Sequence, residues 1–221
     1  MKLAIMQPYV FPYIGYFQLI NSVDTFVFYD DVNFVNSGWI NRNKLFVNNK
    51  ELLFTIPTNW SQNKKINQVS FSENYEKWKT KFLITLKHGY GKKQNFDDML
   101  SIVKETFDKS NDLNSLCKNS ILNVLKYLDV KKNIIFSSDV YNNSFLSASD
   151  RIIDICKKEK CTAYINTIGG VELYSKQQFL LENINLSFIK SKEPLNYLSI
   201  IDIIANRGKE AKLFLDKCEF I

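Results

Sequence analysis

The N-terminal stretch of this chain restricts its fold more than any other segment. An apolar run over Lys2–Met6 stops at Gln7 and Pro8. Because proline has no backbone donor, such a run cannot continue inside a central sheet, so we expect a short buried strand that ends there. The prolines that follow disfavour helix in the residues before them, which predicts an ordered non-helical loop over residues 7–13.

A helix and a second strand are predicted next. Residues 14–23 place apolar side chains at mixed spacings of three and four, and residues 25–29 are rich in β-branched and aromatic types. In open α/β sheets, ligands bind outside the carboxyl ends of the strands. We therefore expect one rim to hold the polar residues that follow the two strands, namely Gln7, Tyr13, Asp30 and Asp31.

The rest of the chain continues to alternate between strand and helix patterns. Strands are expected at residues 51–57, 68–71, 134–137, 161–165 and 186–189. Helices are expected from residue 75 to the glycines at 89 and 91, at 96–107, 112–128, 151–159 and 200–206, from about residue 175, and at 209–214, with Ser149-Asp150 and Ser199 as caps and a turn starting at Pro194. This order predicts a single α/β domain over residues 1–221. Its sheet would be mainly parallel and Rossmann-like, with helices on both faces and a helical insertion or lateral layer at about 75–128.

Composition removes several classes of protein. No run approaches the roughly 18 to 20 apolar residues that cross a bilayer, and the N-terminus lacks the features of a signal peptide, so we expect a cytoplasmic protein without a membrane span. The net charge is +6, but the lysines are scattered, which fits solubility or an anionic small ligand better than a nucleic-acid partner. The four cysteines lack metal or redox spacing, so we expect free thiols and no metal.

Two further sites carry chemistry in the sequence. Asn41 and Asn43 flank Arg42, whose fork of donors suits phosphate or carboxylate, although a surface loop would look the same. His88, the single histidine, stands near a predicted helix end. It could cap that helix, or it could act as a base near neutral pH.

Five segments resemble the WbqC family of bacterial surface-polysaccharide gene clusters. They are MQPYVFPYIGYFQLI from Met6, FYDDVNF from Phe28, WINRN from Trp39, SASDRIIDICK from Ser147 and LSIIDIIANRG from Leu198. The resemblance implies transfer of an acyl or aminoacyl group to an amino sugar, in particular a nucleotide-linked one. It also implies an acyl donor carried by a carrier protein or by CoA, with no tightly bound cofactor.

Such a transfer needs a base, donors for an oxyanion and an anchor for phosphate. Asp30 or Asp31 would take the proton or orient the amine, with His88 as the alternative base; a metal site or a capped loop would explain the two carboxylates equally. Gln7 and Tyr13 would donate to the oxyanion. The phosphate would be held by Asn41, Arg42 and Asn43.

A more distant physical resemblance is to nucleotidyltransferases of the HIGH type. They also begin with a strand, a proline-containing loop and a helix, and Tyr13-Ile14-Gly15-Tyr16 stands where their two histidines would be. Gly15 would let the backbone approach an anion, with Tyr13 and Tyr16 beside it, but tyrosine cannot supply the positive charge of an imidazolium. Adenylyl transfer and non-catalytic binding of a sugar nucleotide are therefore the alternatives, and a homo-oligomer is left open.

Overall fold

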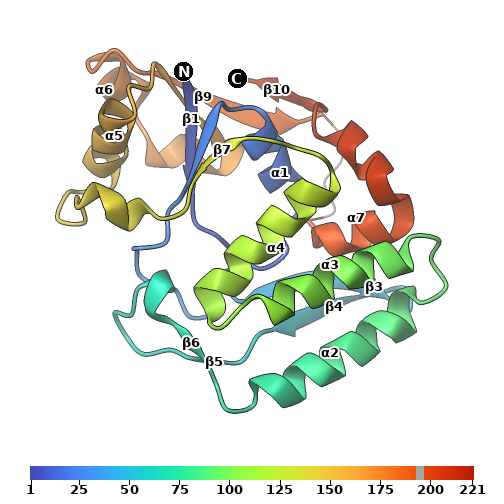
Figure 1. Cartoon of the computed structure of the whole chain (residues 1–221). Helices are drawn as coiled ribbons and strands as arrows, with labels where there is room; N and C mark the ends of the chain where they lie inside the picture. The colour runs from blue at the N-terminus through green and yellow to red at the C-terminus, as the bar shows by residue number, and fades with distance from the viewer. Residues whose placement is uncertain (193–196) are drawn as a thin grey trace.

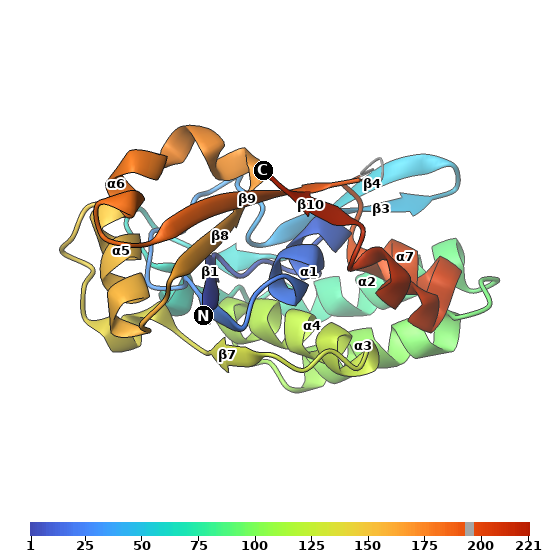
Figure 2. The ribbon, with the colours of Figure 1, turned by 90° about the horizontal axis from the view of Figure 1, so that it is seen from above.

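The computed structural model describes residues 1–192 and 197–221, so the turn expected at Pro194 lies outside the described residues. Six strands form the central sheet in the order β10-β9-β8-β1-β2-β7 (Figures 1 and 2). Their bounds are β1 Lys2–Met6, β2 Thr25–Phe28, β7 Asn133–Ile135, β8 Ala163–Thr167, β9 Asn185–Ser191 and β10 Cys218–Phe220. Strands β1, β2, β7, β8 and β9 run parallel to one another, and β10 pairs with β9 in the antiparallel sense.

Both faces of the sheet are buried under helices. On one face Ala4 belongs to a core shared with α1 (Ile14–Asn21) and α4 (Leu113–Tyr127). On the other face Leu3 and Ile5 pack in a second core with α5 (Ala148–Lys158) and α6 (Lys176–Leu180). Alternate residues of one strand thus serve opposite cores, as the pleat of a strand requires. The expected α/β fold with a mainly parallel, doubly covered sheet is confirmed.

The path of the chain marks one edge of this sheet. From β1 it moves outward to β2 and β7, then returns to the other side of β1 and forms β8, β9 and β10. If only the six strands of this sheet are numbered in chain order, their spatial order from β7 to β10 is 3-2-1-4-5-6, the order of dinucleotide-binding sheets. In such sheets the ligand lies outside the carboxyl ends at the point of reversal, here between β1 and β8.

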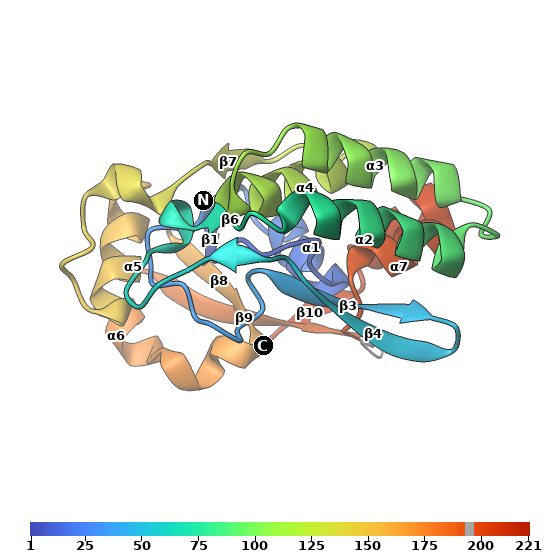
Figure 3. The same cartoon turned by 90° about the horizontal axis from the view of Figure 1, so that it is seen from below.

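A hairpin and a helical layer lie beside the sheet. The hairpin joins β3 (Arg42–Val47) to β4 (Lys50–Thr55), and a smaller ribbon joins β5 (Thr58–Asn59) to β6 (Ser70–Phe71). The helices α2 (Tyr75–Tyr90) and α3 (Phe96–Asp108) run along the hairpin (Figure 3). Aromatic rings join these elements, since Phe54 lies 4.7 Å from Phe82 and Trp78 stacks on Phe82 at 4.9 Å. The remaining elements are α7 (Ile200–Arg207) and four 3-10 helices, Ile66–Gln68, Ser138–Tyr141, Ile168–Leu173 and Gly208–Phe214.

Several local expectations differ from the structure. Arg42 and Asn43 lie in a strand and not in a loop, because the hairpin turns at Asn48 and Asn49, both with positive φ. Ser149 and Asp150 lie inside α5, which begins after Ser147. Strand β10 was not expected, since its residues are half-buried or exposed and lack an apolar run. In contrast, Ser199 caps α7 as predicted, through the amide of Ile201. No helix in the described part of the chain is long and apolar enough to cross a membrane.

Candidate functional site

Asp30 lies just beyond the carboxyl end of β2 and is almost fully buried. Its Oδ2 accepts from Lys118 Nζ at 2.6 Å and from Asn114 Nδ2 at 3.0 Å, both on α4. Its Oδ1 accepts from the Ser137 hydroxyl at 2.6 Å and from the Ser138 amide at 3.2 Å, after β7. All four donors converge on one carboxylate, so Asp30 joins the end of β2 to α4 and to the segment that follows β7.

Asp31 points to a different set of partners. It accepts from the hydroxyl of Ser138 and from the guanidinium of Arg151, in the first turn of α5. Arg151 is itself only 4% exposed, donates from Nε to Asn143 Oδ1 at 2.8 Å, and lies 4.7 Å above the Tyr29 ring. We name Asp30, Asp31, Lys118 and Arg151 the aspartate cluster. Its two ion pairs are buried and hydrogen-bonded, the condition under which such pairs are tolerated in a core.

A cavity of about 360 Å³ opens on the loop that follows β1. Its walls come from that loop, from the stretch that leads into β3, and from the segment before α7. The lining residues are Tyr9, Tyr13, Trp39, Asn43, Lys44 and Tyr197, and we name this space the aromatic cavity. Two of the lining residues, Tyr9 and Tyr13, belong to the loop that leaves the carboxyl end of β1, the end of a strand at which open α/β sheets bind ligands.

The tyrosines of the cavity are held by contacts with one another. The rings of Tyr13 and Tyr197 lie 5.4 Å apart at 42°, and the Tyr13 amide donates to the Tyr9 hydroxyl at 3.3 Å. Burial, with Tyr197 nearby, raises the pKa of Tyr13 above its ordinary value, so its phenol is a neutral donor. The Tyr13 ring also covers Gly15, where a Cβ would lie 2.4 Å from the ring. Glycine at this position is what allows Tyr13 to lie against the start of α1.

The polar groups of the cavity are arranged differently at its wall and at its mouth. The Asn43 amide donates to the carbonyls of Val10 at 3.1 Å and Phe11 at 2.7 Å, which fixes the loop after β1 to β3. Its oxygen accepts from the Lys44 amide at 2.8 Å. The ammonium of Lys44, on a side chain that is 34% exposed, lies 2.7 Å from Glu51. The wall is therefore apolar in effect, and the mouth carries a cation.

The other predicted residues are distributed around these two regions. Tyr16 is buried, and its hydroxyl donates to the Gln7 carbonyl at 3.1 Å. Asn41 donates to the Ile56 carbonyl at 2.9 Å, and Arg42 donates to the Ser37 carbonyl with its guanidinium 5.5 Å from the Trp39 ring.

The structure brings Tyr13 and Asn43 together at the aromatic cavity, whereas Asp30 and Asp31 lie in the aspartate cluster. His88 is exposed in the last turn of α2, beside the β3–β4 hairpin. The catalytic roles of Gln7, Asp30, Asp31 and His88 stay predictions.

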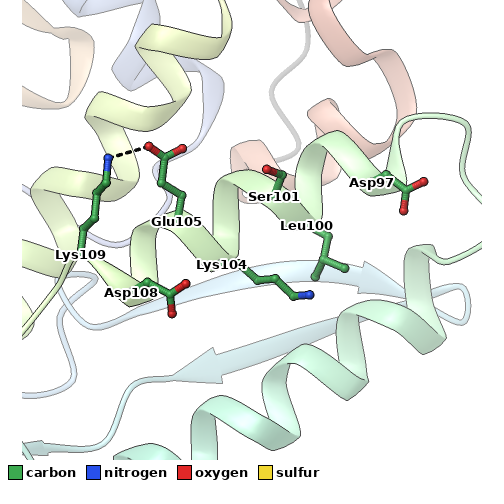
Figure 4. Close-up of a pocket in the computed structure, with 7 residues that line it drawn as sticks. All are labelled: Asp97, Leu100, Ser101, Lys104, Glu105, Asp108 and Lys109. Atoms are coloured by element: carbon green, nitrogen blue, oxygen red, sulfur yellow. Dashed lines mark hydrogen bonds and ion pairs between the residues drawn. The ribbon is translucent and has the colours of Figure 1, made fainter.

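A second hollow, an open trough of about 600 Å³, lies along α3 (Figure 4). Its lining is confined to one face of that helix and consists of Asp97, Leu100, Ser101, Lys104, Glu105, Asp108 and Lys109. Five of these seven side chains are charged, and Glu105 is already paired with Lys109 at 2.7 Å. Charges that alternate along an exposed face are typical of a solvated helix, so we place no site there.

Sequence reasoning missed six residues that shape these regions. They are Tyr9, Trp39, Lys44, Lys118, Arg151 and Tyr197. One signal was available for Arg151, because it directly precedes Ile152 and Ile153 on the apolar face of α5, and a cation there requires a buried partner. Lys44 and Tyr197 carry no such signal, since only the fold brings them beside Tyr13.

Comparison with known proteins gives a family and no activity. The WbqC-like protein family model matches residues 7–213. A relative from Mycobacterium tuberculosis (strain ATCC 25618 / H37Rv), the uncharacterized protein Rv1507c, is 23% identical over 231 residues and is covered to 98%, as is this chain. No solved structure matches. Because the matched segment includes the loop after β1, the aspartate cluster and α7, the chain belongs to the WbqC-like protein family.

Proposed function

We propose that this chain is an N-acyl or N-aminoacyl transferase that acts on a nucleotide-linked amino sugar. The amine nitrogen attacks the carbonyl carbon of a thioester on a carrier protein or CoA. A C–N bond forms, the C–S bond breaks, the nitrogen loses one proton, and the departing thiolate takes up one. The observation that carries this proposal is the aromatic cavity, which the loop leaving the carboxyl end of β1 lines with Tyr9 and Tyr13.

Gln7 is suited to the developing oxyanion in this proposal. It follows β1 directly, and its carbonyl is held by the Tyr16 hydroxyl, which fixes its backbone. Its side chain is half-buried, and among residues 1–192 and 197–221 the amide has no hydrogen-bond partner. Because this side-chain amide is unpaired and its backbone is held, it can donate to a tetrahedral oxyanion without first breaking another bond.

The proton acceptor is proposed among the predicted carboxylates. Asp30 is the better candidate, because its partner Lys118 is 12% exposed and can turn toward solvent, whereas Arg151 is 4% exposed and encloses Asp31. Asp31 would then act as a positioning residue through α5. Transfer of the amine proton to Asp30 would weaken its pair with Lys118, which would be left to interact with water.

The test is mass spectrometry of amino-sugar nucleotides incubated with the full chain and a panel of acyl and aminoacyl thioesters. We expect a product heavier by the acyl group, and a large loss of rate in Gln7→Ala. Gln62→Ala, in an exposed loop, is the matched control and should keep the wild-type rate. Sugar-nucleotide binding without product across the whole panel would contradict the proposal and would favour a non-catalytic binder.

A further inference from the structure

We propose that the aromatic cavity binds the base and adjoining phosphate of the nucleotide-linked substrate. The base would stack on the rings of the wall, and Lys44 would leave Glu51 to hold the phosphate. The identity of the ligand rests on the proposed function. The site itself does not, because free nucleotides can test it without any transfer reaction.

The walls of the cavity suit a flat aromatic ring. Four of the six lining residues are aromatic, and they come from three separate segments of the chain. Trp39 and Tyr197 are 50% and 63% exposed, so part of each ring remains accessible to a ligand, whereas Tyr13 is fixed by its contacts with Tyr197 and Gly15. Stacking of a base on such rings does not depend strongly on which base it is, and removal of one ring weakens binding by about tenfold.

The polar groups of the wall argue against a sugar ring in the same space. Each buried sugar hydroxyl needs a hydrogen-bond partner, since an unpaired one is costly. The Asn43 amide is already used by Val10, Phe11 and Lys44. Among the described lining residues there is no carboxylate, and the groups that remain are the phenols of Tyr9, Tyr13 and Tyr197, the Trp39 indole and the Lys44 ammonium, so strong acceptors are lacking for the several hydroxyl donors of a pyranose.

The mouth of the cavity supplies the charge that a phosphate requires. The side chains of Lys44 and Glu51 are 34% and 52% exposed, and a pair that reaches solvent in this way is weak and easily exchanged. A phosphate carries more charge than a carboxylate and more acceptor oxygens. Arg42 lies beside Trp39 and has a buried Nε without a partner among the described residues, so a second cation is close to the same wall. An apolar acyl chain would gain nothing from these cations.

Calorimetry on the full chain tests the proposal with nucleoside 5′-monophosphates, the matching nucleosides, glucosamine and pantetheine 4′-phosphate. We expect the monophosphates to bind about tenfold more tightly than the nucleosides, and glucosamine not to bind. Trp39→Ala should weaken nucleotide binding about tenfold. Trp60→Ala is the control, because Trp60 is similarly exposed but packs against Phe34, outside the cavity lining.

Charge variants on the hairpin test the phosphate contact separately. Lys44→Met should remove the advantage of the monophosphate over the nucleoside, and Glu51→Gln should increase it by freeing Lys44. Lys50→Met, an exposed lysine of the same hairpin, should change neither. All five variants, the two tryptophan variants included, alter exposed or half-exposed side chains, and circular dichroism checks that each one folds.

The outcomes separate this inference from the proposed transferase. Pantetheine phosphate binding without nucleotide binding would overturn the inference and assign the cavity to the acyl donor. Nucleotide binding that is unchanged in Trp39→Ala and Lys44→Met would place the nucleotide elsewhere and also overturn it. If acyl transfer were detected in either case, the proposed function would still hold. Nucleotide binding at this cavity without acyl transfer would refute the proposed function but would support the cavity as a nucleotide-binding site.

Discussion

The aspartate cluster and the aromatic cavity both lie near the carboxyl edge of the sheet, but they use their polar atoms in opposite ways. In the cluster, Asp30 and Asp31 together accept from six donors within the protein. In the cavity, Trp39 and Tyr197 are 50% and 63% exposed, and the ammonium of Lys44 is held by a single exposed carboxylate, that of Glu51. The cluster therefore fixes the end of β2 to α4, to the segment after β7 and to α5, and the cavity has surface left for a ligand.

This difference shows that acidic residues at a strand end are not sufficient evidence for a catalytic pair. A buried carboxylate requires a cation and further donors wherever it stands, so structural and catalytic aspartates look alike in a sequence. A half-exposed tryptophan next to a cation, such as Trp39, is a different kind of evidence. Contact of its apolar ring with water costs free energy, and the fold by itself does not offset that cost. Substitutions in the aspartate cluster should therefore lower the stability of the protein more than substitutions in the aromatic cavity.

The largest effect is expected for Asp31→Asn. The substitution leaves Arg151 buried with an uncompensated charge, and removal of one partner of a buried pair costs about 3–5 kcal/mol. Urea denaturation should show a fall of this size in the free energy of unfolding. Asp139→Asn, an exposed carboxylate three residues after Phe136, is the control and should stay near wild type.

A second substitution can show whether the missing charge is the cause. Asp31→Leu combined with Arg151→Met removes both charges and should be more stable than Asp31→Asn alone. If Asp31→Asn were instead as stable as wild type and lost acyl transfer, Asp31 would belong to the chemistry and the contrast between the two regions would fail.

Asp30→Asn is expected to cost less, about 1–3 kcal/mol. Its partner Lys118 is 12% exposed and can reach water when the carboxylate is gone, and an asparagine can still accept from Ser137 or Ser138. The same denaturation measurement gives the ranking. A loss for Asp30→Asn equal to that for Asp31→Asn would mean that Lys118 is as tightly enclosed as Arg151.

Gly15→Ala tests the link between the helix α1 and the cavity. The new Cβ would meet the Tyr13 ring at 2.4 Å, so the ring must move, at an overpacking cost of about 1–3 kcal/mol that is partly offset by the helix preference of alanine, about 1 kcal/mol. We expect a net loss of stability of about 1 kcal/mol and altered near-UV circular dichroism from the displaced tyrosine. Gly169→Ala, with no atom nearer than 3.9 Å to its Cβ, should change neither signal. An unchanged spectrum in Gly15→Ala would show that Tyr13 is not held by this contact.

The sequence predicts the parts of the fold that depend on local pattern. The loop after β1, the helix α1 and the strand β2 follow from two prolines, one apolar stripe and one β-branched run. The hairpin β3–β4 also has a local signal, because Asn48 and Asn49 both adopt the positive φ that a tight hairpin turn requires. The cap of α7 by Ser199 needed only the residue before an apolar run.

The site was harder to predict from the sequence, because its contacts join residues that are far apart in the chain. Tyr13 and Tyr197 meet only once β1 and the segment before α7 are placed, and Asp31 meets Arg151 across 120 residues. The sequence identified Tyr13 and Asn43 by the density of polar and aromatic types around them. It could not show that the Asn43 amide donates to Val10 and Phe11, and the part of Asn43 in holding a phosphate stays a prediction.

The smallest effect on stability is expected for Lys44→Met, and this makes it the sharpest probe of the cavity. Its pair with Glu51 is exposed on both sides, so its loss should change the free energy of unfolding by about 0–1 kcal/mol. Addition of 1 M salt should bring wild type and variant closer together, because screening weakens the pair in the wild type. A loss above about 2 kcal/mol would mean that Lys44 supports the fold as Lys118 and Arg151 do, and Lys44 would then not be free to leave Glu51 for a ligand.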